Sequence, residues 1–92
     1  MLRKPTVLPG SSFPLGATVY PNGVNFSVFS QNASAIELLL FDTAQAAKPD
    51  HVIELDPIRH QTYHYWHVFV PELKAGQIYA YRVYGEYAPE KG

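Results

Sequence analysis

Hydrophobic and polar residues alternate along most of this chain, in short runs separated by turn residues. From Val24 to Ser30, apolar side chains at positions 24, 26 and 28 alternate with Asn25 and Ser27. Because strand side chains point alternately to opposite sides of a sheet, this run predicts a strand with one buried and one solvated face. Comparable runs predict five further strands, over residues 17–20, 36–41, 51–55, 64–70 and 77–85.

The spacing of these runs predicts an all-β fold. Turn signals such as Pro21-Asn22-Gly23 recur about every 8–12 residues, and no run has the period of an amphipathic helix. We therefore expect an immunoglobulin-like antiparallel β-sandwich over residues 13–92, preceded by an extended leader over residues 1–12. Such a sandwich has about seven strands, so the last one is expected to be missing. An open sheet edge and more protein beyond it would follow.

The bend between the last two runs contains Leu73, Gly76 and Tyr79 at intervals of three residues. This spacing resembles the tyrosine corner of immunoglobulin-like sandwiches, in which a tyrosine hydroxyl bonds to the backbone a few residues upstream. A chain that crosses between sheets leaves backbone groups without ladder partners, and a phenol in the core can satisfy one of them. We expect such a corner here; the alternative is an ordinary hairpin loop.

Composition narrows the classes of function. The 92 residues suffice for one domain, 47% of them are hydrophobic, and none is cysteine, which rules out disulfides and thiolate metal sites. Seven basic and eight acidic residues give a net charge of −1 without a Lys/Arg stripe, so nucleic acid is not an expected partner. No segment has the length of a membrane helix or the apolar region of a signal peptide. We expect no membrane partner and a cytoplasmic location.

Candidate catalytic and metal-binding groups do not form a site in the sequence. His60 and His64 would lie about 13 Å apart on one extended strand, whereas zinc ligands lie about 2 Å from the ion. Glu54 and Asp56 share a strand face, but a small sandwich offers no evident cleft for two catalytic acids. Neither a nucleophile elbow nor a phosphate-binding glycine loop is present. We expect no metal, no cofactor and no catalytic residue in this segment.

The strands carry a surplus of aromatic side chains. If Trp66, Val68 and Val70 face the core, the residues between them face outward. A large exposed apolar surface marks an interface, and the residues expected to form this one are Tyr65, His67, Phe69, Leu39, Phe41 and Arg82. Two uses compete for it: docking on another protein domain and stacking of aromatic rings on sugars. Its aliphatic content favours docking.

Several blocks, taken together and in order, resemble one family. They are Phe13-Pro-Leu-Gly16-Ala, Gly23-Val-Asn-Phe-Ser-Val-Phe-Ser30, Glu37-Leu-Leu-Leu-Phe-Asp42, His64-Tyr-Trp-His-Val and Tyr79-Ala-Tyr-Arg-Val. Over residues 10–92 the chain resembles the N-terminal domain of bacterial glycogen debranching enzymes of the isoamylase type, which is classed with carbohydrate-binding module family 48. The resemblance implies an early-set immunoglobulin-like fold and a parent enzyme that hydrolyses α-1,6 branch linkages in glycogen. It places the catalytic carboxylates in a following (β/α)8 barrel, so none is carried over here.

The resemblance is weakest where glucan binding is concerned. Glycogen-binding members carry a Trp soon after the third strand, a Lys beside the later tyrosine, and another Trp after the glycine. The matching stretches of this chain hold Phe41-Asp42-Thr43, Ala80 and Tyr87. Tyr87 is the one of these that keeps a ring for stacking on a sugar, and Tyr84 and Trp66 are the other weak candidates.

Three hypotheses follow. The first is a non-catalytic accessory domain that packs against the catalytic barrel of the same polypeptide, with weak glucan binding at most. The second is an autonomous glycogen- or starch-binding module, or the module of a branching enzyme, since branching enzymes carry such a domain too. The third is an unrelated fibronectin-like interaction domain. With an open strand edge, the isolated fragment is also expected to self-associate.

Overall fold

The computed structural model describes residues 6–85, which form seven strands and no helix. The strands are β1 (Gly16–Tyr20), β2 (Gly23–Phe29), β3 (Ala33–Phe41), β4 (His51–Glu54), β5 (Gln61–Thr62), β6 (Tyr65–Pro71) and β7 (Ile78–Gly85). Six of them coincide with the predicted runs to within a few residues. The two-residue β5 has no predicted counterpart, because two residues are too few to show a period.

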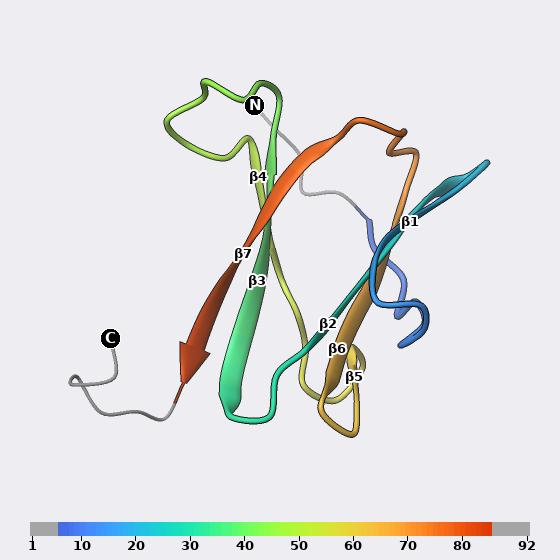
Figure 1. Ribbon diagram of the computed structural model, residues 1–92, viewed down its shortest axis with the longest axis vertical. Coiled ribbons are helices and arrows are strands. Elements are labelled where there is room, and N and C mark those ends of the chain that lie inside the picture. The colour runs from blue at the N-terminus through green and yellow to red at the C-terminus, as the bar shows by residue number, and fades with distance from the viewer. Residues whose placement is uncertain (1–5, 86–92) are drawn as a thin grey trace.

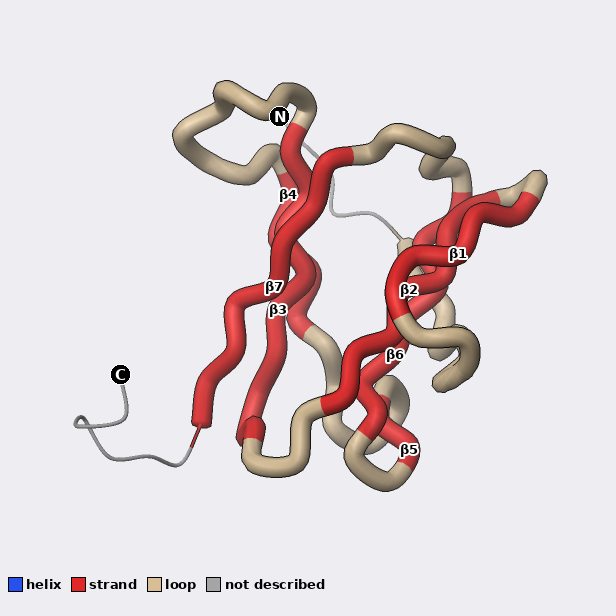
Figure 2. Tube along the Cα trace, in the orientation of Figure 1, coloured by secondary structure: helices blue, strands red, loops and turns tan. Residues whose placement is uncertain are grey.

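The strands form two antiparallel sheets that face each other (Figure 1). The first sheet has the order β1-β2-β6-β5, and the second sheet has the order β4-β3-β7. The loops that carry the chain between the sheets lie at the two ends of the sandwich (Figure 2). This arrangement confirms the predicted all-β, immunoglobulin-like sandwich.

The core lies between the sheets and takes one side of each long strand. Its buried members are Val24, Phe26, Ile36, Leu38, Leu40, Ile53, Leu55, Trp66, Val68 and Val70. The alternation in β2 and β6 therefore predicts correctly which side of each strand faces the core. Tyr79 of β7 joins this core, with its ring centroid 4.9 Å from that of Phe26 in an edge-to-face arrangement.

The outward side of β2 is covered, which contradicts the predicted solvated face. Asn25 and Ser27 are each only 2% exposed, because residues 7–12, here called the strap, cross the outside of the first sheet (Figure 1). Asn25 exchanges two hydrogen bonds with the backbone of Ser11, at 2.8 and 2.9 Å. Ser27 Oγ donates to Ser12 O at 2.8 Å. The polar side chains of β2 thus bind backbone rather than water.

Gly10 lets the strap approach the sheet closely. Its φ of +77° lies in the left-handed region that favours glycine. A Cβ at this position would lie 2.6 Å from Asn25 Oδ1 and 2.7 Å from Phe69 N. Next to Gly10, Leu8 and Phe69 are joined by two backbone hydrogen bonds of 2.9 Å each. The strap is therefore an integral part of the first sheet's outer side.

The bend between β6 and β7 is held differently from the predicted tyrosine corner. Leu73 packs against the core, and Gly76 adopts a φ of +91° in the turn. Within residues 6–85, however, the Tyr79 hydroxyl makes no hydrogen bond to the upstream backbone. Gln77 instead donates from Nε2 to Phe41 O at 2.9 Å and to Ile78 O at 3.0 Å. The side chain that ties this bend to the end of β3 is therefore Gln77.

Candidate functional site

The six predicted docking residues do not form one surface. Tyr65, His67 and Phe69 lie on the outside of the first sheet, whereas Leu39, Phe41 and Arg82 lie on the outside of the second. The core separates the two groups, so they occupy opposite sides of the domain (Figure 1). The prediction of a single surface is wrong in this respect, because alternation assigns a residue to one side of its strand but does not say which sheet the strand joins.

The outer surface of the second sheet is polar at its centre. Glu37 of β3 accepts hydrogen bonds from Arg82 Nη1 at 3.0 Å and from the Tyr84 hydroxyl at 3.1 Å. Glu37 also lies directly opposite Glu54 of β4, and the Arg82 charge offsets this pair of like charges. Leu39, which follows along the same side of β3, is buried rather than exposed. The surface therefore presents an ion pair in place of the apolar patch that was predicted.

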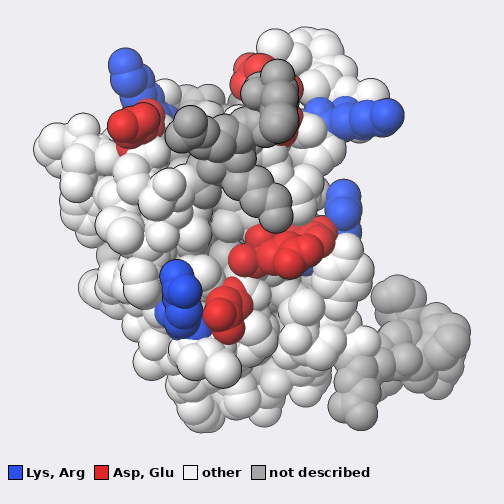
Figure 3. All heavy atoms as spheres, turned by 180° about the vertical axis from the view of Figure 1, so that it is seen from behind, with Lys and Arg blue, Asp and Glu red and all other residues white. Residues whose placement is uncertain are grey.

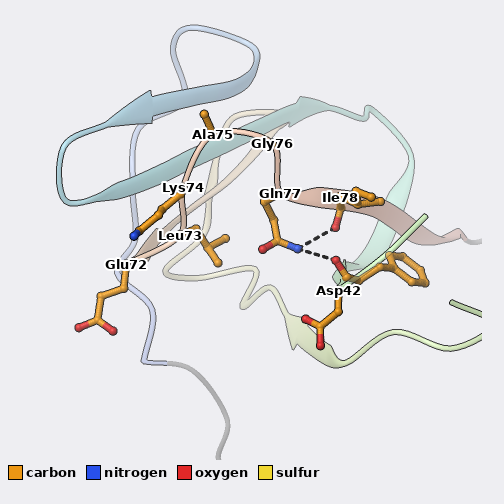
Figure 4. Close-up of a pocket in the computed structure, with 9 residues that line it drawn as sticks. Asp42, Glu72, Leu73, Lys74, Ala75, Gly76, Gln77 and Ile78 are labelled. Carbon is orange, nitrogen blue, oxygen red and sulfur yellow. Dashed lines mark hydrogen bonds between the residues drawn. The ribbon is translucent and has the colours of Figure 1, made fainter. Parts of the chain in front are cut away.

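A shallow hollow of about 330 Å³ lies at one end of this sheet, between β3 and the bend that leads into β7 (Figure 4). The Gln77 amide and the Leu73 side chain lie toward its middle, with Glu72, Lys74 and Asp42 around it. The backbone N–H of Asp42 donates to the Asp50 carboxylate, which closes the loop between β3 and β4. The hollow combines two carboxylates and one lysine with an amide, so it can form hydrogen bonds to a polar ligand.

On the first sheet, His67 ties the strap to β5. The ring is buried; Nδ1 lies 2.7 Å from Pro9 O, and Nε2 lies 2.8 Å from Thr62 Oγ1. A carbonyl can only accept, so Nδ1–H donates to Pro9, and in the neutral ring Nε2 accepts from the Thr62 hydroxyl. His67 is therefore a structural link, and its prediction as an outward docking residue is wrong because the strap covers it.

Exposed apolar side chains gather beside the strap, in a group that we call the aromatic surface: Phe13, Leu15, Phe29 and Tyr65. Phe13 is 78% exposed, Leu15 56% and Phe29 47%. Ser12, Phe13, Leu15 and Tyr65 line a hollow of about 450 Å³ that contains no charged residue. The rings of Phe29 and Tyr65 meet edge to face, with centroids 5.2 Å apart and planes at 66°. Rings tilted in this way do not form the flat plate on which sugar rings stack, whereas they suit an apolar protein partner.

Of the three residues predicted to stack on sugars, the structure describes two. Trp66 is 1% exposed, in the core, so its prediction as a sugar-binding residue is wrong; the alternation of β6 directs it inward. Tyr84 keeps 43% of its surface exposed, but its hydroxyl is bonded to Glu37. Tyr87 lies outside the described residues. Of the three candidates, Tyr84 is thus the one that the structure shows with an exposed ring.

Two of the histidines are buried for structural reasons. His60 Nδ1 accepts a hydrogen bond from the Asp56 backbone N–H at 2.8 Å. Burial lowers the pKa of His60, Arg59 lowers it further, and Asp56 opposes the change, so the environment favours the neutral ring. Among residues 6–85, no three His, Asp or Glu side chains gather as a metal site requires.

Charged side chains are sparse on the face of the molecule that is turned away from the viewer in Figure 1. Lys and Arg side chains there lie apart from one another, several of them beside acidic groups, instead of forming a stripe (Figure 3). Within residues 6–85 there is also no helix long and apolar enough to cross a membrane. The features that distinguish the surface are therefore the aromatic surface and the polar second sheet.

A comparison with known families assigns the chain. The model of carbohydrate-binding module 48, described as the isoamylase N-terminal domain, matches residues 14–92. The chain belongs to this family. Family membership decides against the fibronectin-like hypothesis and agrees with the two-sheet fold.

Relatives of this family 48 domain include isoamylases of plants and glycogen debranching enzymes of bacteria. Isoamylase SU1, chloroplastic, of Zea mays is 46% identical over 90 residues, which cover 94% of this chain and 11% of that protein. The glycogen operon protein GlgX homolog of Mycobacterium tuberculosis is 40% identical over 88 residues, 96% of this chain and 11% of the relative. The glycogen debranching enzyme of Serratia proteamaculans is 40% identical over 84 residues, 91% and 12% respectively. The domain thus spans about a tenth of the length of these curated relatives.

Sequence reasoning missed the strap and the exposed residues Phe13 and Leu15. One signal was available: the outward residues of β2 are Asn25 and Ser27, which carry an amide and a hydroxyl but no charge. Neutral hydrogen-bonding side chains can be buried at low cost when they are paired, whereas carboxylates cannot. The part of β2 whose outward residues are only neutral and polar is therefore compatible with a covering segment, whereas Phe29, farther along the same side, stays 47% exposed.

Proposed function

We propose that this chain is a non-catalytic accessory domain of an α-glucan debranching enzyme and that it docks on the catalytic domain of the same polypeptide. The observation that carries the proposal is the aromatic surface, in which Phe13, Leu15 and Tyr65 line a hollow without charged residues and the exposed Phe29 packs against Tyr65. Exposed apolar surface of this kind is typical of protein interfaces. The relatives, roughly nine times longer than the aligned region, support a large partner in the same chain.

Glucan binding by the domain itself is proposed to be weak at most. The Trp and Lys of glycogen-binding members are replaced here, by Phe41-Asp42-Thr43 and by Ala80, and the Trp66 indole is in the core. An autonomous glycogen-binding module is the second candidate. It is favoured by the polar hollow beside Gln77 and by the partly exposed ring of Tyr84.

Bond cleavage is assigned to the catalytic domain, a (β/α)8 barrel in the family that the sequence resembles. Glycoside hydrolysis needs two carboxyl groups across a bound sugar, one of them able to hold a proton. The facing pair Glu37 and Glu54 lies on an open sheet surface, and Glu37 is bonded to Arg82. The names of the relatives favour a debranching rather than a branching parent, and we place it in the cytoplasm.

The decisive experiment uses the glycogen debranching enzyme of Serratia proteamaculans in three forms: intact, without its N-terminal domain, and with that domain replaced by this chain. We expect the truncated enzyme to lose thermal stability and activity on glycogen, and the chimera to recover both. In the chimera, Phe13→Ser with Leu15→Ser should weaken the recovery, while Val52→Ser on the opposite surface should not.

Two results would overturn this function. One is a truncated enzyme as stable and as active as the intact one, which would leave nothing for the domain to support. The other is strong retardation of the isolated 92-residue chain in glycogen-containing gels, which would favour the autonomous binding module. An unretarded chain together with a functional chimera supports the accessory role.

A further inference from the structure

Within residues 6–85, one edge of β7 has no partner strand, and the hydrogen bonds of β3 show which backbone groups of β7 face that edge. Leu55 and Asp50 donate to Ile36 O and Leu40 O, so the even-numbered residues of β3 point toward β4. Backbone groups alternate in direction along an antiparallel strand. The odd-numbered residues of β3 therefore pair with Ile78, Ala80 and Arg82 of β7, their partners in the register.

It follows that Tyr79, Tyr81 and Val83 direct their N–H and C=O groups away from β3. Among residues 6–85, β3 is the one strand that pairs with β7. Val83 adds a second sign of an uncovered edge. Its side chain lies on the core side of the sheet opposite the fully buried Ile36, yet it is 52% exposed. The core is thus open beside β7.

The other edges of the two sheets are shorter or covered. β1, β4 and β5 contain five, four and two residues, whereas β7 contains eight. The strap covers part of the β6 edge through Leu8. Short strands, prolines, lysines and bulges are the devices that protect sheet edges, and β7 has no proline and no lysine. Its one charged side chain, Arg82, is bonded to Glu37 on the outer surface.

We propose that β7 pairs with β7 of a second copy of this chain, antiparallel and with Tyr81 opposite Tyr81 across a two-fold axis. This register brings Tyr79, Tyr81 and Val83 of both copies into one hydrogen-bonded ladder. On the core side, Val83 then lies opposite Tyr79 of the second copy, so an exposed aliphatic side chain gains an aromatic neighbour. On the outer side, Arg82 lies opposite Ala80, so the two guanidinium groups are kept apart. The inference is independent of the docking role proposed above.

The first test is the mass of the 92-residue chain in solution, measured by size-exclusion chromatography with light scattering from micromolar to millimolar concentration. We expect a monomer–dimer equilibrium. Val83→Lys places a charge at the joined edge and should leave a monomer throughout. The matched control is Val19→Lys on β1, because Val19 has the same exposed fraction of 52% and should leave the dimer intact. Circular dichroism checks that both variants remain folded.

The second test reports on the register and does not depend on Val83→Lys folding. The chain has no cysteine, so a chain carrying Ala80→Cys can be mixed with one carrying Arg82→Cys. In the proposed register these positions form a non-hydrogen-bonded pair with Cα atoms about 4.5 Å apart, close enough for a disulfide. Cross-linking should be strong in the mixture and weak for either variant alone.

Three outcomes would overturn the proposal. A monomer at every concentration would mean that the β7 edge does not pair with a second copy. A dimer abolished by Val19→Lys but not by Val83→Lys would place the contact on β1. Equal cross-linking in all mixtures would indicate association without a defined register.

Discussion

The two outer surfaces of the sandwich are built from strands with similar alternation but have opposite characters. On the first sheet, the outward residues of β2 are Asn25 and Ser27, and the strap covers them. On the second sheet, the outward residue of β3 at the centre is Glu37, whose side chain is 15% exposed and is paired with the more exposed Arg82. The comparison shows that the polar side of a strand is not necessarily exposed to solvent. Amides and hydroxyls can be buried against backbone, whereas a carboxylate keeps its surface open.

The largest predicted loss of stability is at Gly10, where the strap approaches the first sheet closely. In Gly10→Ala, the new Cβ meets backbone atoms of β6 that cannot move away, and we expect a loss of about 3 kcal/mol in unfolding free energy. Gly16→Ala is the matched control, since Gly16 also has a positive φ, +86°, but nothing within 4 Å of the added Cβ. It should cost about 1 kcal/mol. Equal losses in urea denaturation would mean that the strap is not held tightly.

An intermediate effect is expected at Asn25. Asn25→Ala leaves Ser11 N–H and Ser11 O without their partners under the strap, which should cost about 1–3 kcal/mol. On the opposite surface, Tyr84→Phe removes an equally well-formed bond to Glu37, but water can replace it, so the change should stay within about 0.5 kcal/mol. Both are measured by chemical denaturation. A Tyr84 loss as large as that of Asn25 would remove the distinction between the surfaces.

The smallest predicted effect is the pH dependence of stability that comes from His60. Burial lowers the pKa of His60 in the folded chain, so below the unfolded pKa of about 6.5 the unfolded chain binds the proton more readily. The contribution of His60 to stability is therefore fully present well above pH 6.5 and is lost progressively as the pH falls through and below that value. His60→Asn keeps an acceptor for the Asp56 N–H and should flatten this dependence. Thermal unfolding across the range measures it, and an unchanged slope in the variant would assign the effect to other groups.

The strands were predictable because their signal is local. The alternation of β2 and β6, and the turn at Pro21–Gly23, are contained in a few neighbouring residues. The strap was not, because its contacts join residues far apart in the sequence, such as Pro9 with His67. Phe13 and Leu15 precede the first periodic run, so no pattern assigned them a side. The Gln77 tie was missed for a similar reason: a glutamine amide that bonds to β3 leaves no mark in the spacing of Leu73 and Tyr79.

The link that His67 makes between Pro9 and Thr62 has a practical consequence for cutting the domain out of a longer gene. The family match begins at residue 14, and a fragment started there would lack every backbone group that Asn25, Ser27 and His67 bind. The side chains of Asn25, Ser27 and His67 would then be exposed to water instead of bonded to the backbone of the strap. An expression fragment should therefore start upstream of Val7, so that the recombinant protein retains the strap.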